Sequence, residues 1–191
     1  MTAVAPAAGT RRGPTALGVG VVVWLASELM FFAGLFAAYF TLRAVSPTAW
    51  PPPGVELSTG RTLGATLVLV VSSGTMHLAA GAAKRADRVA VVRWLALTAA
   101  LGVVFLANTF IEWHTDGFGI DSHPYGSIFY VLTGFHALHV AGGVAFMGSS
   151  AALVQGKSKA PVASTIEACA AYWHFVDVVW VAVFLTVYVL R

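Results

Sequence analysis

Residues 122–156, SHPYGSIFYVLTGFHALHVAGGVAFMGSSAALVQG, contain no aspartate, glutamate, lysine or arginine. A helix that crosses a membrane needs about 20 mostly apolar residues, and this stretch exceeds that length. Long apolar runs also occur before and after this stretch, and most charged residues lie at the ends of the runs. We therefore predict five transmembrane helices, at about 17–42, 62–83, 92–113, 126–154 and 166–190.

The composition agrees with a chain whose outer surface faces lipid. Hydrophobic residues make up 58% of the 191 residues, charged residues only 10%, and the mean hydropathy is +0.80. Soluble domains carry about 25% charged residues. The apolar runs are too long for membrane β-strands and do not alternate as barrel strands must. The net charge of +3 includes no basic patch dense enough to indicate nucleic acid. The predicted fold is an all-α integral membrane protein.

The chain is expected to form one membrane domain, residues 16–191, after a short tail. Residues 1–15 are rich in alanine, glycine and proline, which predicts a flexible tail. The apolar run that follows is too long for a signal peptide and lacks a small-residue cleavage pattern. The single cysteine, Cys169, cannot form an internal disulfide and is expected to be a packing thiol.

The basic residues predict the orientation of the chain. Short cytoplasmic loops carry an excess of lysine and arginine. With five spans, eight of the 11 basic residues fall on the N-terminal face: Arg11, Arg12, Lys84, Arg85, Arg88, Arg93, Lys157 and Lys159. Three fall on the other face: Arg43, Arg61 and Arg191. The tally predicts a cytoplasmic N-terminus and a C-terminus outside.

Ionisable and imidazole side chains inside the spans are the candidate functional residues. A charge at mid-bilayer costs about 2.5–3.5 kcal/mol on insertion scales, so such residues need partners or a role. Glu28 lies near the middle of the first span, among apolar neighbours. His136 and His139 are three residues apart in the fourth span, and His174 and Asp177 are three apart in the last, so each pair shares a helix face.

Three interpretations of these residues compete. Haem held by two histidines needs one from each of two facing helices, and nothing in the spacing demands that His77 and His174 meet. A metal site could use the His-x-x-His pair, but a di-metal bundle would usually add Glu-x-x-His pairs, which the spans lack. A hydrogen-bonded network joining helices, worth about 0.6 kcal/mol per bond on average, is the interpretation we favour. Within it, Glu28 is the residue expected to have a specialised role.

Other residues are expected at the surface. His77 is predicted to bond a neighbouring backbone group or a lipid headgroup, and Glu112 and Trp113 mark the end of the third span. Four aromatic residues near span ends fit an interfacial belt: Trp94, Trp113, Tyr125 and Tyr188.

Three motifs, each in its own span and in the same order, resemble those of a known family. They are residues 27–32, SELMFF; residues 125–140, YGSIFYVLTGFHALHV; and residues 172–180, YWHFVDVVW. The family is cytochrome c oxidase subunit III, within the haem–copper oxidases. Many of its members have seven spans, and this chain resembles the short five-helix actinobacterial form.

The resemblance implies a non-redox subunit of a proton-pumping aa3-type cytochrome c oxidase in the bacterial plasma membrane. Members of this family carry no haem or copper; haem a and copper belong to the partner subunits I and II, which pass electrons from cytochrome c to oxygen. Subunit III packs on subunit I, binds phospholipid and supports proton uptake, and a cytochrome bc complex is a further expected partner.

By the same resemblance, the polar signature of the family falls on particular residues of this chain. Glu28 matches its intramembrane glutamate, the candidate for proton-uptake support. His136, His139, His174 and Asp177 complete the intramembrane polar network. Five residues are candidates for contacts with lipid or other subunits: His77, Glu112, Trp113, Trp173 and Trp180. The alternatives left open are the equivalent subunit of a quinol oxidase or of a nitric-oxide reductase, and a self-contained membrane haem protein.

Overall fold

The computed structural model describes residues 16–156 and 162–190. Within these residues the chain forms five α-helices and a short π-helix, with no strand. The elements are α1 (Ala16–Val45), α2 (Thr59–Lys84), α3 (Arg88–Thr115), α4 (Pro124–Gln155), α5 (Val162–Phe184) and the π-helix η1 (Leu185–Val189).

Five helices of the described chain are long and apolar enough to cross a membrane, so the predicted all-α, five-helix fold is confirmed. The first four predicted spans each lie inside one helix, and the fifth covers most of α5, then η1 and Leu190; the α-helices begin a few residues before the predicted spans. Arg88, for example, is the first residue of α3 because a long basic side chain at a helix end can reach the polar interface. The tail predicted at 1–15 lies outside the described residues.

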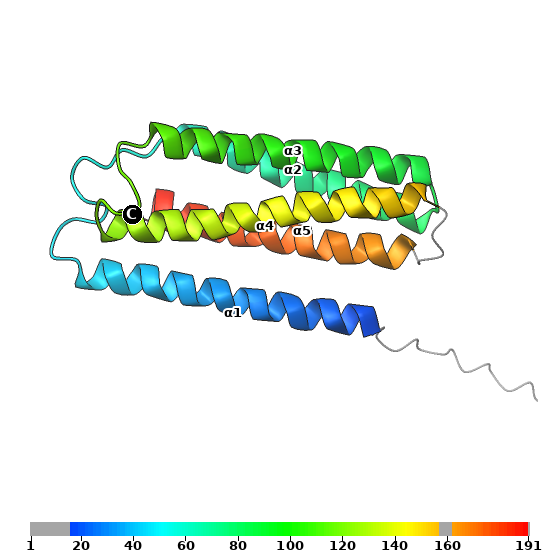
Figure 1. Cartoon of the computed structure of the whole chain (residues 1–191), viewed down its shortest axis with the longest axis horizontal. Coiled ribbons are helices and arrows are strands. Elements are labelled where there is room, and N and C mark those ends of the chain that lie inside the picture. Colours follow the sequence, from blue (N-terminus) through cyan, green and yellow to red (C-terminus); the bar gives the residue numbers. More distant parts are fainter. Residues whose placement is uncertain (1–15, 157–161, 191) are drawn as a thin grey trace, which may run out of the picture.

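The helices form a bundle around α5 (Figure 1). α5 packs against α1, α2 and α4, whereas α1 lies at one edge and packs against α4 and α5. In the most apolar window of each helix, 61% of the α5 residues are buried but only 6% of the α1 residues. α1 therefore presents most of its surface to lipid or to another protein.

Local signals set where the central helices begin. Asp87 caps α3 by accepting a hydrogen bond from the Ala90 amide at 3.0 Å, and the His123 ring caps α4 by accepting one from the Gly126 amide at 2.8 Å. Between α2 and α3 the chain reverses within three residues, with Ala86 in the left-handed region at φ 57°. This short turn holds α2 and α3 side by side as an antiparallel hairpin.

Trp173 of α5 packs where three other helices, α2, α3 and α4, meet α5. Its side chain is fully buried, and its indole N–H donates to Ser72 Oγ of α2 at 2.9 Å. A Cβ atom added at Gly102 of α3 or at Gly143 of α4 would lie 2.7 Å from the indole ring. Glycine at these two positions therefore allows α3 and α4 to close on α5.

We expect the substitution Gly143→Ala to lower the free energy of unfolding by about 1–2 kcal/mol, because the added methyl group overlaps a rigid ring that has no room to move. The matched control is Gly148→Ala in the same helix, where an added Cβ meets nothing within 4 Å. Thermal unfolding in detergent measures both variants. Equal melting temperatures would contradict the tight contact at Trp173.

Two members of the expected interfacial belt are not at the surface. Tyr125 and Tyr188 are 0% and 2% exposed, whereas Trp94 and Trp113 are partly exposed. Both tyrosines lie close to a helix end, but the rotation of their helices turns them into the core. Cys169 is buried, as expected of a packing thiol.

Candidate functional site

Glu28 of α1 meets His139 of α4 within the membrane-spanning region. Glu28 Oε2 lies 3.1 Å from His139 Nε2, and Glu28 Oε1 accepts a hydrogen bond from Trp24 Nε1 at 3.1 Å. His139 Nδ1 lies 2.7 Å from the Phe135 carbonyl oxygen. Because a carbonyl only accepts, Nδ1 carries a proton. The bond between Nε2 and Oε2 then holds one further proton, which leaves the pair neutral overall.

Aromatic side chains surround this pair. The rings of Phe31 and Phe32 have centroids 6.4 Å and 5.0 Å from that of His139. Trp24 stacks on Tyr172 of α5 at 5.0 Å, and the Tyr172 hydroxyl donates to the His139 carbonyl at 2.9 Å. The pair is nevertheless partly open, since 25% of the Glu28 side chain and 16% of the His139 side chain are exposed. A neutral pair at this depth avoids the cost of an isolated charge.

A second polar cluster joins α2 to α5. Ser73 Oγ donates to Asp177 Oδ2, and His174 Nδ1 lies 2.9 Å from the same Ser73 oxygen. Because the serine proton goes to the carboxylate, His174 Nδ1 acts as the donor to Ser73. His77, one helical turn beyond Ser73, lies near His174 and is exposed. Because His174 and Asp177 are three residues apart on α5, both side chains can hydrogen-bond to the same serine of α2, Ser73.

His136 stands apart from both clusters. It is fully buried, and neither ring nitrogen has a hydrogen-bond partner in the described chain. Its ring packs against Phe105 and Trp180, with centroids 5.7 Å and 4.7 Å away. The five predicted network residues thus occupy three places in the fold. Among the described residues, no three histidine, cysteine or acidic side chains gather as a metal site.

Glu112 belongs to a third polar region, where the end of α3 meets the start of α2. Its side chain is 2% exposed and accepts a hydrogen bond from Thr62 Oγ1 at 2.7 Å. Arg61 Nη2 donates to Thr115 Oγ1 at 3.1 Å. Asp116, just beyond α3, is partly buried, and its Oδ2 has no partner among the described residues. The acidic side chains of Glu112 and Asp116 therefore both interact electrostatically with Arg61.

The pKa of Asp116, which lies outside the helices, is raised to about 6, first by burial and then by the neighbouring Glu112 carboxylate, against the opposing pull of Arg61. A raised pKa means that the folded state binds the proton more tightly than the unfolded chain. This carboxyl therefore does not destabilise the fold below about pH 4, and its ionisation increasingly does so as the pH rises through about 6.

Replacing Asp116 with asparagine should consequently stabilise the fold by about 1 kcal/mol at pH 7.5, after discounting for partial exposure. At pH 4 the variant and the parent chain should melt together. Melting temperatures in detergent across this pH range make the comparison, with Asp121→Asn in the adjoining loop as the matched control. A rise in the melting temperature of Asp116→Asn that is equal at pH 4 and pH 7.5 would contradict this account.

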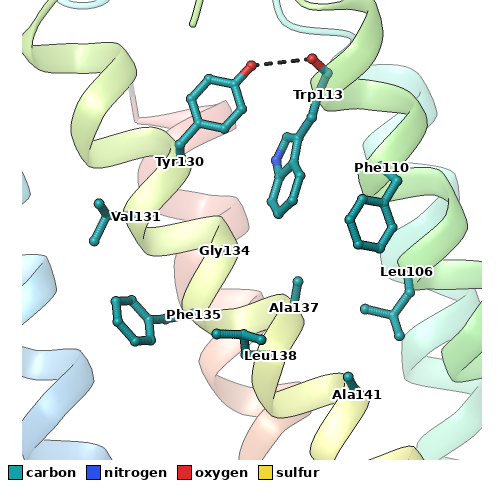
Figure 2. Close-up of a pocket in the computed structure, with 10 residues that line it drawn as sticks. All are labelled: Leu106, Phe110, Trp113, Tyr130, Val131, Gly134, Phe135, Ala137, Leu138 and Ala141. Carbon is teal, nitrogen blue, oxygen red and sulfur yellow. Dashed lines mark hydrogen bonds between the residues drawn. The ribbon is translucent and has the colours of Figure 1, made fainter. Parts of the chain in front are cut away.

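An apolar hollow of about 430 Å³ opens between α3 and α4, near the ends that face the long loops. Small residues of α4 line its floor, and aromatic rings from both helices stand at its sides, as Figure 2 shows. At one end the Tyr130 hydroxyl donates to the Trp113 carbonyl at 3.4 Å. The lining residues are Leu106, Phe110, Trp113, Tyr130, Val131, Gly134, Phe135, Ala137, Leu138 and Ala141.

Burial changes the set of candidates for lipid or subunit contact. Trp113 lines the apolar hollow and His77 is exposed, so both can be reached from outside the chain. Trp173, Trp180 and Glu112 are 0%, 1% and 2% exposed, so their side chains lie inside the described chain, and their contact with lipid or another subunit stays a prediction. Both tryptophans instead donate to hydroxyl groups of α2.

Known proteins are similar to this chain over nearly its whole length. The family model described as "Cytochrome c oxidase subunit III" matches residues 7–191. The chain belongs to the cytochrome c oxidase subunit III family. A protein named "Probable cytochrome c oxidase subunit 3" from Mycobacterium tuberculosis is 41% identical over 194 aligned residues, which cover 100% of this chain and 96% of the relative.

Two more distant relatives carry the name "Cytochrome c oxidase subunit 3". The protein from Corynebacterium diphtheriae is 41% identical over 184 residues, covering 93% of this chain and 90% of its own length. The protein from Synechocystis is 39% identical over 176 residues, covering 90% and 74%. The resemblance inferred from the three motifs is therefore confirmed.

Membership of the subunit III family makes the chain a multi-pass membrane protein of the cytochrome c oxidase complex, in association with other oxidase subunits. The first two motifs of the family resemblance meet at the pair described above, because Glu28 comes from the first and His139 from the second. The third motif supplies Tyr172, which supports His139, and also the separate cluster of His174 and Asp177.

Sequence reasoning missed three residues of these clusters. Trp24 lies four residues before Glu28, so helical spacing places it on the same face and offers a usable signal. Tyr172 was noted only within its motif. Ser73 gives no signal of its own, because several serines and threonines of the same span are equally plausible partners for a carboxylate.

Proposed function

We propose that the chain is the non-redox subunit III of a proton-pumping aa3-type cytochrome c oxidase. In this role it supports the catalytic subunit I by packing against it, by holding phospholipid and by assisting proton uptake. The observation that carries the proposal is the Glu28–His139 pair, which holds a proton at a partly open site deep in the membrane span. A depth of 12 residues into α1 corresponds to about 18 Å along the helix axis.

The partners follow from the same proposal. Haem a and copper, assigned to partner subunits I and II, supply the electron transfer from cytochrome c to oxygen. α1, with its small buried fraction, offers a surface for subunit I or for lipid. A cytochrome bc complex is a further partner. The excess of basic residues on the N-terminal face supports a cytoplasmic N-terminus in a bacterial plasma membrane.

The test of membership in an active oxidase is affinity purification of the C-terminally tagged chain in mild detergent, with a visible spectrum of the eluate. We expect haem a absorbance together with copurified subunits I and II, and loss of that absorbance when those subunits are removed. A copurified quinol oxidase or nitric-oxide reductase would contradict the assignment to an aa3-type enzyme. Haem retained by the isolated chain would favour a self-contained haem protein.

The test of proton-uptake support is substitution at the pair, followed through prolonged turnover. Glu28→Gln keeps the shape of the side chain but cannot release a proton at physiological pH. We expect fewer turnovers before inactivation and weaker proton pumping than in the parent enzyme. The matched control is Glu56→Gln in the exposed loop between α1 and α2. Unchanged pumping and lifetime in both Glu28→Gln and Glu28→Ala would overturn this role.

A further inference from the structure

A second hollow lies between α3 and α4 at the opposite end from the apolar one in Figure 2, which is the right-hand end of the bundle in Figure 1. It encloses about 450 Å³ where α3 begins and α4 ends. Its lining combines two kinds of side chain, polar and aliphatic: Arg88, Arg93 and Gln155 on one hand, and Val89, Val92 and Val154 on the other.

The two arginines are placed to bind an anion. Both line the hollow, although a spacing of five residues turns α3 by about 140° beyond one full turn, so their side chains leave the helix in different directions. Arg88 Nη1 donates to the Val154 carbonyl at 3.1 Å, and both residues line the hollow. A guanidinium group has five N–H donors in a planar fork, so Arg88 keeps further donors for a ligand.

The nearby acidic groups already have partners. The Asp87 carboxylate accepts the capping hydrogen bond from the Ala90 amide. Glu167 pairs with Lys84, at 3.5 Å between Oε1 and Nζ. Arg85 adds a positive charge to the same turn but does not line the hollow. Lys84, Arg85, Arg88 and Arg93 outnumber Asp87 and Glu167 by four to two, so the formal charge of these six side chains is positive.

The aliphatic wall decides which kind of anion fits. Val89 is 60% exposed, and Val92 continues the apolar surface one turn further along α3 towards the interior of the span. A free phosphate would use the arginines but leave this wall in contact with water. A lipid with an anionic headgroup satisfies both halves, since basic hollows between transmembrane helices at the membrane surface suit such headgroups.

We propose that this hollow binds one anionic diacyl phospholipid. Arg88 and Arg93 bind its phosphate, and its glycerol and the first acyl carbons pack against the aliphatic residues of the same hollow, Val89, Val92 and Val154. The inference rests on the lipid-binding part of the proposed function and assigns it a site and a headgroup charge. It places the lipid away from the Glu28–His139 pair, which α1 and α4 form.

The test is native mass spectrometry of the full chain, purified in mild detergent with its copurifying subunits. The probe is phosphatidylglycerol with two oleoyl chains, and phosphatidylcholine with the same chains is the neutral comparison. Without a bilayer there is no charged lipid surface, so the measurement counts lipid held by the protein. We expect one tightly bound phosphatidylglycerol that phosphatidylcholine does not displace. Its affinity should fall at least about ten-fold in Arg93→Gln.

Two further variants test whether the loss of lipid binding comes from this site rather than from a change in net charge or from misfolding. Arg85→Gln removes the same charge from the neighbouring turn between α2 and α3 and should change affinity by less than about two-fold, because an exposed charge at a distance is screened. Val92→Phe leaves the charge intact but fills the apolar wall, and should also weaken binding. Equal losses in Arg85→Gln and Arg93→Gln, or binding of phosphatidylcholine as strong as that of phosphatidylglycerol, would overturn the proposal. Oxygen consumption by the same preparations tests the proposed function separately, because an active enzyme without the bound lipid would contradict only the lipid site.

Discussion

Replacing Trp173 with alanine is expected to lower the free energy of unfolding by about 3–5 kcal/mol, the range for large buried aromatic side chains. The indole ring lies at the junction of α3, α4 and α5 and is fully buried. The two glycines that face it have no side chains to fill the space it would leave. The substitution also removes the hydrogen bond from the indole N–H to Ser72.

The measurement is equilibrium or thermal unfolding in detergent, with Trp94→Ala as the matched control. Trp94 is a partly exposed tryptophan of α3, so its loss opens no closed cavity and should cost about 1 kcal/mol or less. The loss of unfolding free energy in Trp173→Phe should lie between those of Trp173→Ala and Trp94→Ala, because phenylalanine keeps part of the packing but lacks the N–H donor. A loss in Trp173→Ala no larger than in Trp94→Ala would show that the three helices do not depend on this ring.

Replacing Ser73 with alanine is expected to cost about 2–3 kcal/mol. Ser73 is the donor to Asp177, whose side chain is 6% exposed and whose other oxygen has no partner in the described chain. Without the serine hydroxyl, a buried carboxyl group and the His174 ring lose their shared partner. Leaving such groups unsatisfied costs more than the net contribution of an ordinary hydrogen bond.

A second substitution identifies the source of this cost. In the Ser73→Ala background, Asp177→Leu removes the unpaired carboxyl and should recover much of the lost stability, because an apolar group of similar size no longer needs a donor. Ser149→Ala is the control for losing a serine hydroxyl that bonds only within its own helix, to the Phe146 carbonyl. If Asp177→Leu destabilises the chain as much with Ser73 replaced as with Ser73 present, the unpaired carboxyl is not the cause.

The positions of charges were enough to predict the helices of this chain. Long charge-free runs exist because each helix must cross an apolar layer, and that requirement acts on every residue in the run. The ends were less predictable. The predicted spans exclude Arg43 and Arg88, yet Arg43 lies in the last turn of α1 and Arg88 in the first turn of α3, since a long basic side chain at either end of a helix can reach the polar interface.

The pairing within the site could be predicted only in part. The spacing of His136 and His139 places them near one face but does not say which of them turns towards α1. In the fold, His139 meets Glu28, while His136 is enclosed by Phe105 and Trp180. Helix rotation is decided by packing over the whole contact, including the glycines that admit Trp173. No local pattern in the fourth span contains that information.

The place of α1 at the edge of the bundle has a consequence for how the protein is made. Among the described helices, α1 precedes in the sequence the two helices that it packs against, α4 and α5, and is synthesised before them. Glu28 is separated from His139 by 111 residues, so at about 5–20 residues per second it waits about 6–22 seconds for its partner. During that interval a carboxyl group sits in the membrane on a helix with no neighbour. We therefore expect α1 to reach its place in the bundle only after the fourth helix has entered the membrane.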